Sequence, residues 1–241
     1  MRVISFALIW SGLLCAWSVP AADHQVVGDF SAGTNPKGVP NGWELKEKTG
    51  RADLSVMKSD GVHAVQLRSA DTSFSLQRQI QVDVKQYPIL TWKWKVNKLP
   101  VGGDFRKTKT DDQAAQLFVA FSRTRAIVYI WDTSAPQGLM ADAPSPPFMA
   151  IKAVVVRSGP GDLGQWLAEK RNVYEDYQKF FGAAEKAPVA SGLRIQINTQ
   201  HTRTSGESYF AEVKFEAPAA KEDASNKLAP HGLATTTASA F

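Results

Sequence analysis

Apolar and polar residues alternate over most of the chain. The clearest stretch is YPILTWKWKVN, where Leu90, Trp92, Trp94 and Val96 fall on one face and lysines fall on the other. A period of two indicates a half-buried β-strand, because successive side chains of a strand point to opposite faces. The same alternation predicts strands at 63–69 and 73–82. Enrichment in Val, Ile, Phe and Tyr predicts further strands at 114–122, 126–132, 148–158, 192–199 and 208–216.

Turn-forming residues separate these stretches. Gly, Pro, Asn and Asp cluster in NPKGVPNG, KSDG, LPVGG, DAPSPP and SGPGD. Roughly nine or ten short strands, the eight stretches above among them, are typical of an all-β protein when turns separate them in this way. We therefore expect an antiparallel jelly-roll β-sandwich.

One stretch, GQWLAEKRNVYEDYQKFFG, departs from the alternation. Its residues Trp166, Val173, Tyr177 and Phe181 recur at helical spacing, and Asp162 can cap the start of a helix. The pattern predicts one amphipathic helix, at about 162–181, packed on the sandwich. Its charged residues then either face water or form a site.

The first 22 residues have the pattern of a secretory signal peptide. Arg2 precedes an apolar run, which is followed by Pro20 and by small residues that suit cleavage. We expect a periplasmic or secreted protein of the bacterial envelope, with no membrane span after cleavage. The folded domain is predicted at 23–217. Residues 218–241, rich in Ala, Ser, Thr and Lys, are predicted to be a disordered tail.

Charge and cysteine content limit the kinds of site and partner that the protein can have. Cys15 is the only cysteine and would leave with the signal, so disulfides and thiolate sites are excluded from the mature chain. Loss of Arg2 lowers the formal charge from +5 to +4. A weakly cationic protein favours acidic polymers. The basic residues are dispersed, so nucleic acid is not an expected partner.

Catalytic and metal-binding motifs are absent. The chain has no G-x-S-x-G, H-E-x-x-H or P-loop sequence, and its four histidines are scattered. The stretch GPGDLG at 159–164 matches G-x-G-x-x-G in its glycine spacing, but it is better interpreted as a tight turn before the predicted helix. We predict no catalytic residue, cofactor or metal. Carboxylates such as Asp111 and Asp112 are the remaining catalytic groups, since a glycosidase needs two of them across the scissile bond. Alternatively, these two residues form a solvated turn before a strand.

Several polar and aromatic residues could instead bind a ligand. Arg171 and Asn172 offer a planar donor fork and an amide, which suit vicinal hydroxyls or a carboxylate. Internal ion pairs of Arg171 with Glu175 or Asp176 are the alternative. The full hypothetical ligand site consists of Asp111, Asp112, Trp131, Arg157, Trp166, Arg171 and Asn172.

Five stretches carry a resemblance to a known family. PILTWKWKVNKLP, TDDQAAQLFVAF, YIWDTSAPQG, VVVRSG and LGQWLAEKRNVYEDYQKFFG resemble the bacterial family of domain of unknown function 3047 (DUF3047), over about residues 26–216. The resemblance implies an exported β-sandwich similar to galactose-binding-like carbohydrate modules, and it implies no activity. The chain departs from the family pattern at Gln116, where an Arg is expected, and at 198–208, where an Asp-rich turn is expected. Any site that those groups form is therefore lost or changed here.

Together these patterns predict an exported, non-enzymatic β-sandwich that binds a carbohydrate or acidic glycan, or another small polar ligand. Two alternatives stay open: an envelope hydrolase that acts on glycans through carboxylates, and a scaffold or assembly module. The sequence does not fix the oligomeric state.

Overall fold

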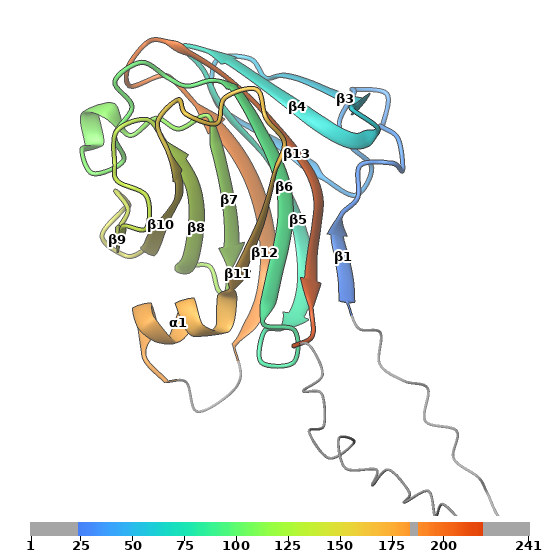
Figure 1. Cartoon of the computed structure of the whole chain (residues 1–241), viewed down its shortest axis with the longest axis vertical. Helices are drawn as coiled ribbons and strands as arrows, with labels where there is room; N and C mark the ends of the chain where they lie inside the picture. Colours follow the sequence, from blue (N-terminus) through green and yellow to red (C-terminus); the bar gives the residue numbers. More distant parts are fainter. Residues whose placement is uncertain (1–23, 184–187, 219–241) are drawn as a thin grey trace, which may run out of the picture.

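The computed structural model describes residues 24–183 and 188–218. The predicted signal peptide (1–22), and the predicted tail beyond residue 218, lie outside these residues. Within them the chain forms thirteen strands, the α-helix α1 (Val173–Phe181) and the short 3₁₀ helix η1 (Thr108–Thr110). Two sheets pack face to face (Figure 1), which confirms the predicted all-β sandwich of jelly-roll type.

One sheet has six strands. In the order β11-β6-β13-β4-β3, all neighbours are antiparallel, and β1 pairs with the end of β13. The strands are β1 (His24–Gly28), β3 (Asp53–Ser59), β4 (Val62–Ala70), β6 (Ile89–Lys98), β11 (Leu167–Asn172) and β13 (Ser205–Glu216).

The other sheet has seven strands, in the order β2-β5-β12-β7-β8-β10-β9. Its pairs are antiparallel except for β8 and β10, which run parallel. The strands are β2 (Glu44–Thr49), β5 (Ser73–Asp83), β7 (Ala115–Ala120), β8 (Arg125–Asp132), β9 (Met140–Asp142), β10 (Ala150–Ser158) and β12 (Val189–Asn198).

The main core lies between the two sheets. Leu90, Trp92, Trp94 and Val96 all belong to it, as the alternation in β6 predicts. Trp94 packs between Trp92, at 5.4 Å between ring centroids, and Trp131, at 5.8 Å. Aromatic rings at such separations add to the stabilisation that burial provides.

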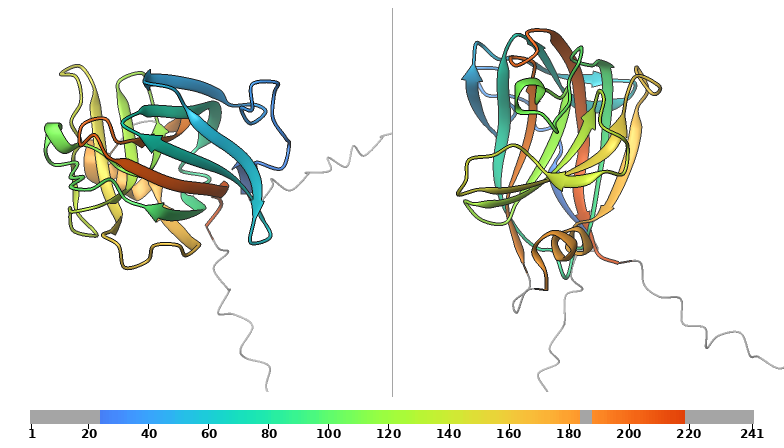
Figure 2. Two further views of the ribbon diagram at one scale, coloured as in Figure 1. Left: turned by 90° about the horizontal axis from the view of Figure 1, so that it is seen from above. Right: turned by 90° about the vertical axis from the view of Figure 1, so that its left-hand side faces the viewer.

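A second, smaller apolar cluster lies on the outer face of the seven-stranded sheet. Phe118, Val128 and Ile130 point outward there and pack against Ala135 and residues near β9. The segment 133–149 covers these side chains before β10 returns parallel to β8. The right-hand view of Figure 2 shows this segment, in yellow-green, on the near side. One part of this face is thus covered, and the rest remains open.

The helix is shorter than the sequence pattern predicts. Residues 167–172, expected inside a helix spanning about 162–181, instead form β11, which pairs with β6 along six residues. This pairing satisfies the backbone groups at the edge of β6, and it outweighs the local helical spacing. The helix starts at Val173, with Asn172 as its cap instead of Asp162: the side-chain Oδ1 accepts a 3.1 Å hydrogen bond from the Glu175 amide.

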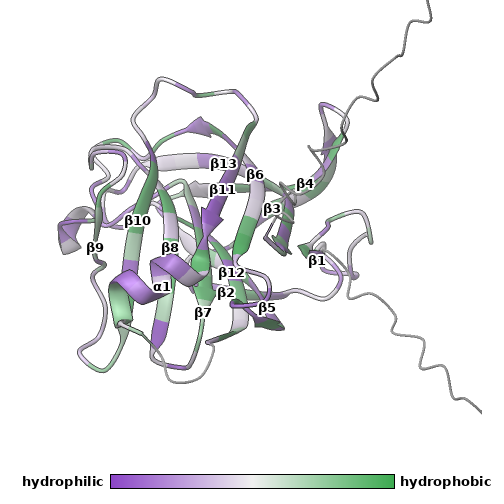
Figure 3. Cartoon of the chain, turned by 60° about the horizontal axis from the view of Figure 1, so that its bottom comes forward, coloured by the Kyte–Doolittle hydropathy of each residue, from purple (hydrophilic) through white to green (hydrophobic). Residues whose placement is uncertain are grey.

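The short helix closes one end of the sandwich. Val173 and Tyr177 of α1 belong to the main core. Figures 1 and 3 show α1 across the end of the sheets beside β8 and β10, with its hydrophilic residues in purple. Its apolar side faces the core, so the amphipathic character predicted from the sequence is present over nine residues.

Candidate functional site

Arg171 lies at the closed end of the sandwich and is paired. Its Nη2 and Nε donate to the two carboxylate oxygens of Asp176 at 2.6 and 3.0 Å, and Asp176 is 1% exposed. The hydroxyl of Tyr129 donates to the same carboxylate at 3.0 Å. The side-chain amide of Asn172 forms two hydrogen bonds with Glu175, one to its carboxylate and one from its backbone amide. Of the two interpretations of Arg171, the structure thus shows the internal ion pair, which joins β11, α1 and β8.

Arg157 also makes internal pairs, at the side of the sandwich. Its Nε donates to Glu169 at 2.7 Å, and its Nη1 donates to Asp162 at 3.3 Å. Glu169 in turn accepts a 3.0 Å hydrogen bond from the indole of the buried Trp94. Because Arg157 belongs to β10 and Glu169 to β11, this pair links the two sheets.

The two candidate tryptophans differ in surroundings. Trp131 is fully buried, and its indole nitrogen donates to the Gly159 carbonyl at 3.0 Å. Trp166 lies on the outer side of the six-stranded sheet, where its indole donates to Asp60 at 3.0 Å. The ammonium of Lys95 lies 5.2 Å from the Trp166 ring centroid, so a cation of the protein already contacts this ring.

Asp111 and Asp112 are not the solvated turn that the sequence left open. Asp112 is completely buried and accepts hydrogen bonds from the Thr202 amide at 2.6 Å, the Thr202 hydroxyl at 2.8 Å and Asn198 at 3.1 Å. It therefore holds the turn after β12 in place. Asp111 lines a cavity. The structure does not bring the seven candidate residues into one site, and Asp111 alone among them borders the hollow described next.

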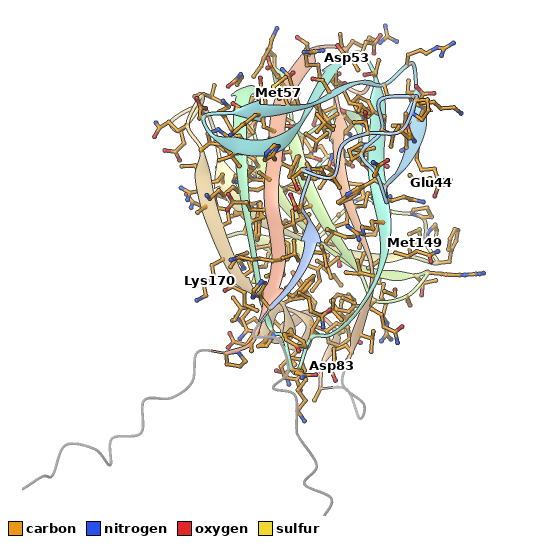
Figure 4. The ribbon with its side chains drawn as sticks, turned by 90° about the vertical axis from the view of Figure 1, so that its right-hand side faces the viewer. Glu44, Asp53, Met57, Asp83, Met149 and Lys170 are labelled. Atoms are coloured by element: carbon orange, nitrogen blue, oxygen red, sulfur yellow. The ribbon has the colours of Figure 1, made fainter. Side chains whose placement is uncertain are left out.

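A groove of about 750 Å³ runs over the open part of the outer face of the seven-stranded sheet. It is continuous with an adjoining cavity of about 330 Å³, because Phe118, Met149, Ile151 and Arg194 line both. Figure 4 places Glu44 and Met149, which line the groove, on one side of the sandwich and Lys170 on the other. Volumes in this range suit small-molecule and oligomeric ligands.

The alternation of β12 and β7 builds the floor of this hollow. Leu193, Ile195 and Ile197 enter the main core, and the intervening Arg194 and Gln196 therefore face outward. Phe118 lies opposite Arg194 in the register of the two strands. Arg194 lies where the groove meets the adjoining cavity.

Arg194 is stacked on Phe118 without a counter-charge. The guanidinium carbon lies 3.7 Å from the ring centroid, which is a close cation–π contact. No hydrogen bond or ion pair of its side chain is found among residues 24–183 and 188–218. Burial alone lowers the pKa of Arg194 to about 10. The side chain thus stays protonated at neutral pH, although its surroundings favour the neutral form.

Other groups around the groove are mostly basic or amide. Arg78 donates to the Val27 carbonyl at 3.3 Å, and Arg125 donates to the Tyr177 hydroxyl at 3.4 Å. Arg123 is exposed at the rim. Glu44 is the single acidic residue among the described residues that line the groove. The groove is therefore cationic.

Amides and one carboxyl form the floor of the adjoining cavity. Gln113 donates to Asp111 at 3.1 Å, and Asn198 donates to the Asp111 carbonyl at 2.6 Å. The ring of His201 contacts the same carbonyl at 3.0 Å. Burial raises the pKa of the Asp111 carboxyl to about 6, so it is partly protonated in mildly acidic solution.

Sequence reasoning missed most of these residues. Phe118, Arg194 and Gln196 belong to predicted strands, but periodicity does not show which outward positions stay uncovered. A signal did exist nearby: Gln116 and the stretch 198–208 are the two departures from the family pattern. Gln116, Asn198 and His201 all line the adjoining cavity.

The described part of the chain shows neither a metal-ligating cluster nor a membrane-spanning helix. There, no group of three or more His, Cys, Asp or Glu residues is placed to hold a metal ion. Nor does any helix in those residues have the length and hydropathy needed to cross a bilayer.

The family model for proteins of unknown function DUF3047 matches residues 41–214, more than half of the chain. The chain belongs to the DUF3047 family. The matched region of this DUF3047 protein includes the groove, the adjoining cavity and α1. Curated proteins gave no match.

Solved structures with a related arrangement of strands share little sequence with this DUF3047 protein. A family 11 carbohydrate-binding module of Clostridium thermocellum is 10% identical, with a TM-score of 0.42 over 82% of this chain and 96% of that one. A xyloglucanase domain from Sinorhizobium fredii is 8% identical, with a TM-score of 0.45 over 74% and 95%. An endoglucanase from Trichoderma harzianum is 9% identical, with a TM-score of 0.42 over 80% and 97%. Similarities of this size do not identify a shared function.

Proposed function

We propose that this DUF3047 protein is an exported carbohydrate-binding protein whose ligand lies in the groove of the seven-stranded sheet. The observation that carries the proposal is the groove itself. Its 750 Å³ are open to solvent and bordered by Gln77, Gln79 and several arginines beside apolar surface. Hydroxyl-rich ligands need such a mixture, because amides and guanidinium groups bind hydroxyls while flat apolar surface covers C–H faces.

An exposed aromatic residue beside the groove supports the same function. Phe148 is 73% exposed, and it precedes Met149, which lines both the groove and the cavity. Pro144 and Pro146 restrict the conformation of the loop that carries it. A sugar in the groove would stack on this ring. Covering the ring is favourable, because apolar surface exposed to water raises the free energy.

The groove and the adjoining cavity support glycan hydrolysis less well than glycan binding. Asp111 has a raised pKa, as a general acid requires. However, among the described residues it is the single carboxylate that lines the adjoining cavity, and Glu44 is the single one in the groove. A glycosidase of the usual kind needs two carboxyl groups across one bond. Binding without catalysis therefore fits the arrangement better.

A glycan array probed with the mature domain tests the proposal. We expect binding to at least one oligosaccharide, and Ala120→Trp should abolish it by filling the groove, which Ala120 lines. Lys170→Trp, on the opposite side of the sandwich, is the matched control and should bind as the wild type does. Circular dichroism must show that both variants are folded. An array without bound glycan, or binding that survives Ala120→Trp, would contradict the proposal.

Export is the second part of the proposal, and it rests on the signal pattern of residues 1–22. Expression of the full chain in a bacterium, followed by fractionation and mass spectrometry of the N-terminus, tests it. The expected product is periplasmic or secreted and starts at Ala22 or Asp23. An intact Met1 in the cytoplasmic fraction would contradict export.

A further inference from the structure

Resting on the proposed function, we infer that the glycan carries carboxylate groups, and that Arg194 binds one of them where the groove meets the adjoining cavity. The ligand class is thus a uronic-acid-containing oligosaccharide, as distinct from a neutral one.

The first support is the state of the Arg194 guanidinium. A charge that is removed from water is normally paired, because desolvation without a counter-charge is costly. Arg157 and Arg171 follow this rule, with carboxylate oxygens at 2.7 and 2.6 Å. Arg194 has no such partner in the described residues, and it faces a hollow that can hold a ligand.

The second support is geometric. Stacking on Phe118 at 3.7 Å covers one face of the guanidinium and leaves its N–H edges for a ligand. A planar fork of this kind matches the two oxygens of a carboxylate, which it can bind through two parallel hydrogen bonds. The aromatic ring fixes the fork in advance, so little side-chain entropy is lost when the ligand binds.

The third support is the sign of the surrounding charge. Arg78, Arg123 and Arg125 also line the groove, where Glu44 is the single acidic side chain among the residues that the structure describes. Arg123 is exposed at the rim and can attract an anion before contact. Arg78 and Arg125 are each held by an oxygen of the protein. Arg194 therefore makes the direct contact in this interpretation, and the others contribute long-range attraction.

Matched pairs of ligands test the inference by isothermal titration calorimetry. The probes are tetramers of galacturonate, glucuronate and mannuronate, each compared with its methyl ester, which keeps the sugar and removes the charge. For the wild type we expect at least one acid to bind roughly 10- to 100-fold more tightly than its ester, as for a hydrogen-bonded charge. Arg194→Met should remove this preference, so that this variant binds the acid and its ester with affinities within about threefold of each other.

Lys170→Met is the control for net charge, because it removes one positive charge from the opposite side of the sandwich. It should keep the preference for the acid. Equal loss in Lys170→Met and Arg194→Met would assign the preference to overall charge and overturn the inference. Neutral glycans that bind as tightly as every acid would also overturn it, although the proposed function would survive. If no acid, ester or array glycan binds, both proposals fail.

Discussion

Arg171 and Arg194 are both half-buried arginines next to an aromatic ring, yet their surroundings differ. Arg171 lies 6.0 Å from the ring of Tyr129 and donates two hydrogen bonds to the Asp176 carboxylate. Arg194 lies 3.7 Å from Phe118 and has no carboxylate partner in the described residues. The guanidinium of Arg171 is thus neutralised by a carboxylate of the protein. The guanidinium of Arg194 has hydrogen-bond donors that a ligand can use. Compensation of charge, more than residue type, therefore separates the structural Arg171 from Arg194, which we propose as the binding residue.

The largest effect on stability is expected when Arg171 is changed. Arg171→Met leaves the Asp176 carboxylate, 1% exposed, without its cation at the closed end of the sandwich. We expect the free energy of unfolding to fall by about 3 kcal/mol, since an unpaired buried charge is strongly destabilising. Urea unfolding measures this change. Lys170→Met, at an exposed neighbour, should change the free energy of unfolding by less than about 0.5 kcal/mol. An equally small effect of Arg171→Met would contradict the structural role of Arg171.

An intermediate effect, dependent on pH, is expected at Asp111. Its pKa is raised from 3.8 to about 6, so the folded protein holds this proton more tightly than the unfolded chain does. Unfolding then releases a proton between these values, and this group lowers the free energy of unfolding as pH rises from about 4 to 6. The loss of unfolding free energy caused by ionising Asp111 is complete above about pH 6 and absent below about pH 4.

Asp111→Asn should remove that cost and can still accept the hydrogen bond from Gln113. At pH 7 we expect a gain of about 1 to 3 kcal/mol in unfolding free energy over the wild type, and little difference at pH 3.5. The difference between the two proteins across pH isolates this carboxyl from the other titrating groups. A gain that is the same at both pH values would contradict the account.

The smallest effect on stability is expected at Arg194. Arg194→Met keeps an apolar side chain over Phe118 and removes a charge that has no partner, so the free energy of unfolding should change by less than about 1 kcal/mol. Thermal and urea unfolding of Arg194→Met and Arg171→Met, measured under the same conditions, compare the two losses of stability. A loss as large as that of Arg171→Met would mean that Arg194 is also a structural residue.

The fold was largely predictable from sequence, for a physical reason. The eight predicted strands correspond to β4, β5, β6, β7, β8, β10, β12 and β13, and in each of them one face enters the main core. β2 was missed because this edge strand has one apolar residue, Leu45, in the sequence ELKEKT. β11 was missed because its pairing with β6 depends on a strand that lies far away in the sequence.

The site was much less predictable. Sequence showed which residues share a face of a strand, but not that segment 133–149 covers part of the outer face and leaves Arg194 open. Arg171 and Arg157 were conspicuous in a family-like run, and their carboxylate partners occupy them. Asp111 lines the adjoining cavity, but residues that share this cavity come from β7, β8, β10 and β12, most of which lie far from it in the sequence.

The most direct test of the central claim, that the groove is the binding site, is an NMR titration of the ¹⁵N-labelled mature domain. The probe is the oligosaccharide bound most tightly on the array. We expect the largest amide shifts at Gln77, Phe118, Gly192 and Arg194, all on the outer face of the seven-stranded sheet. Shifts confined to α1 and β11, around Arg171, would contradict the account.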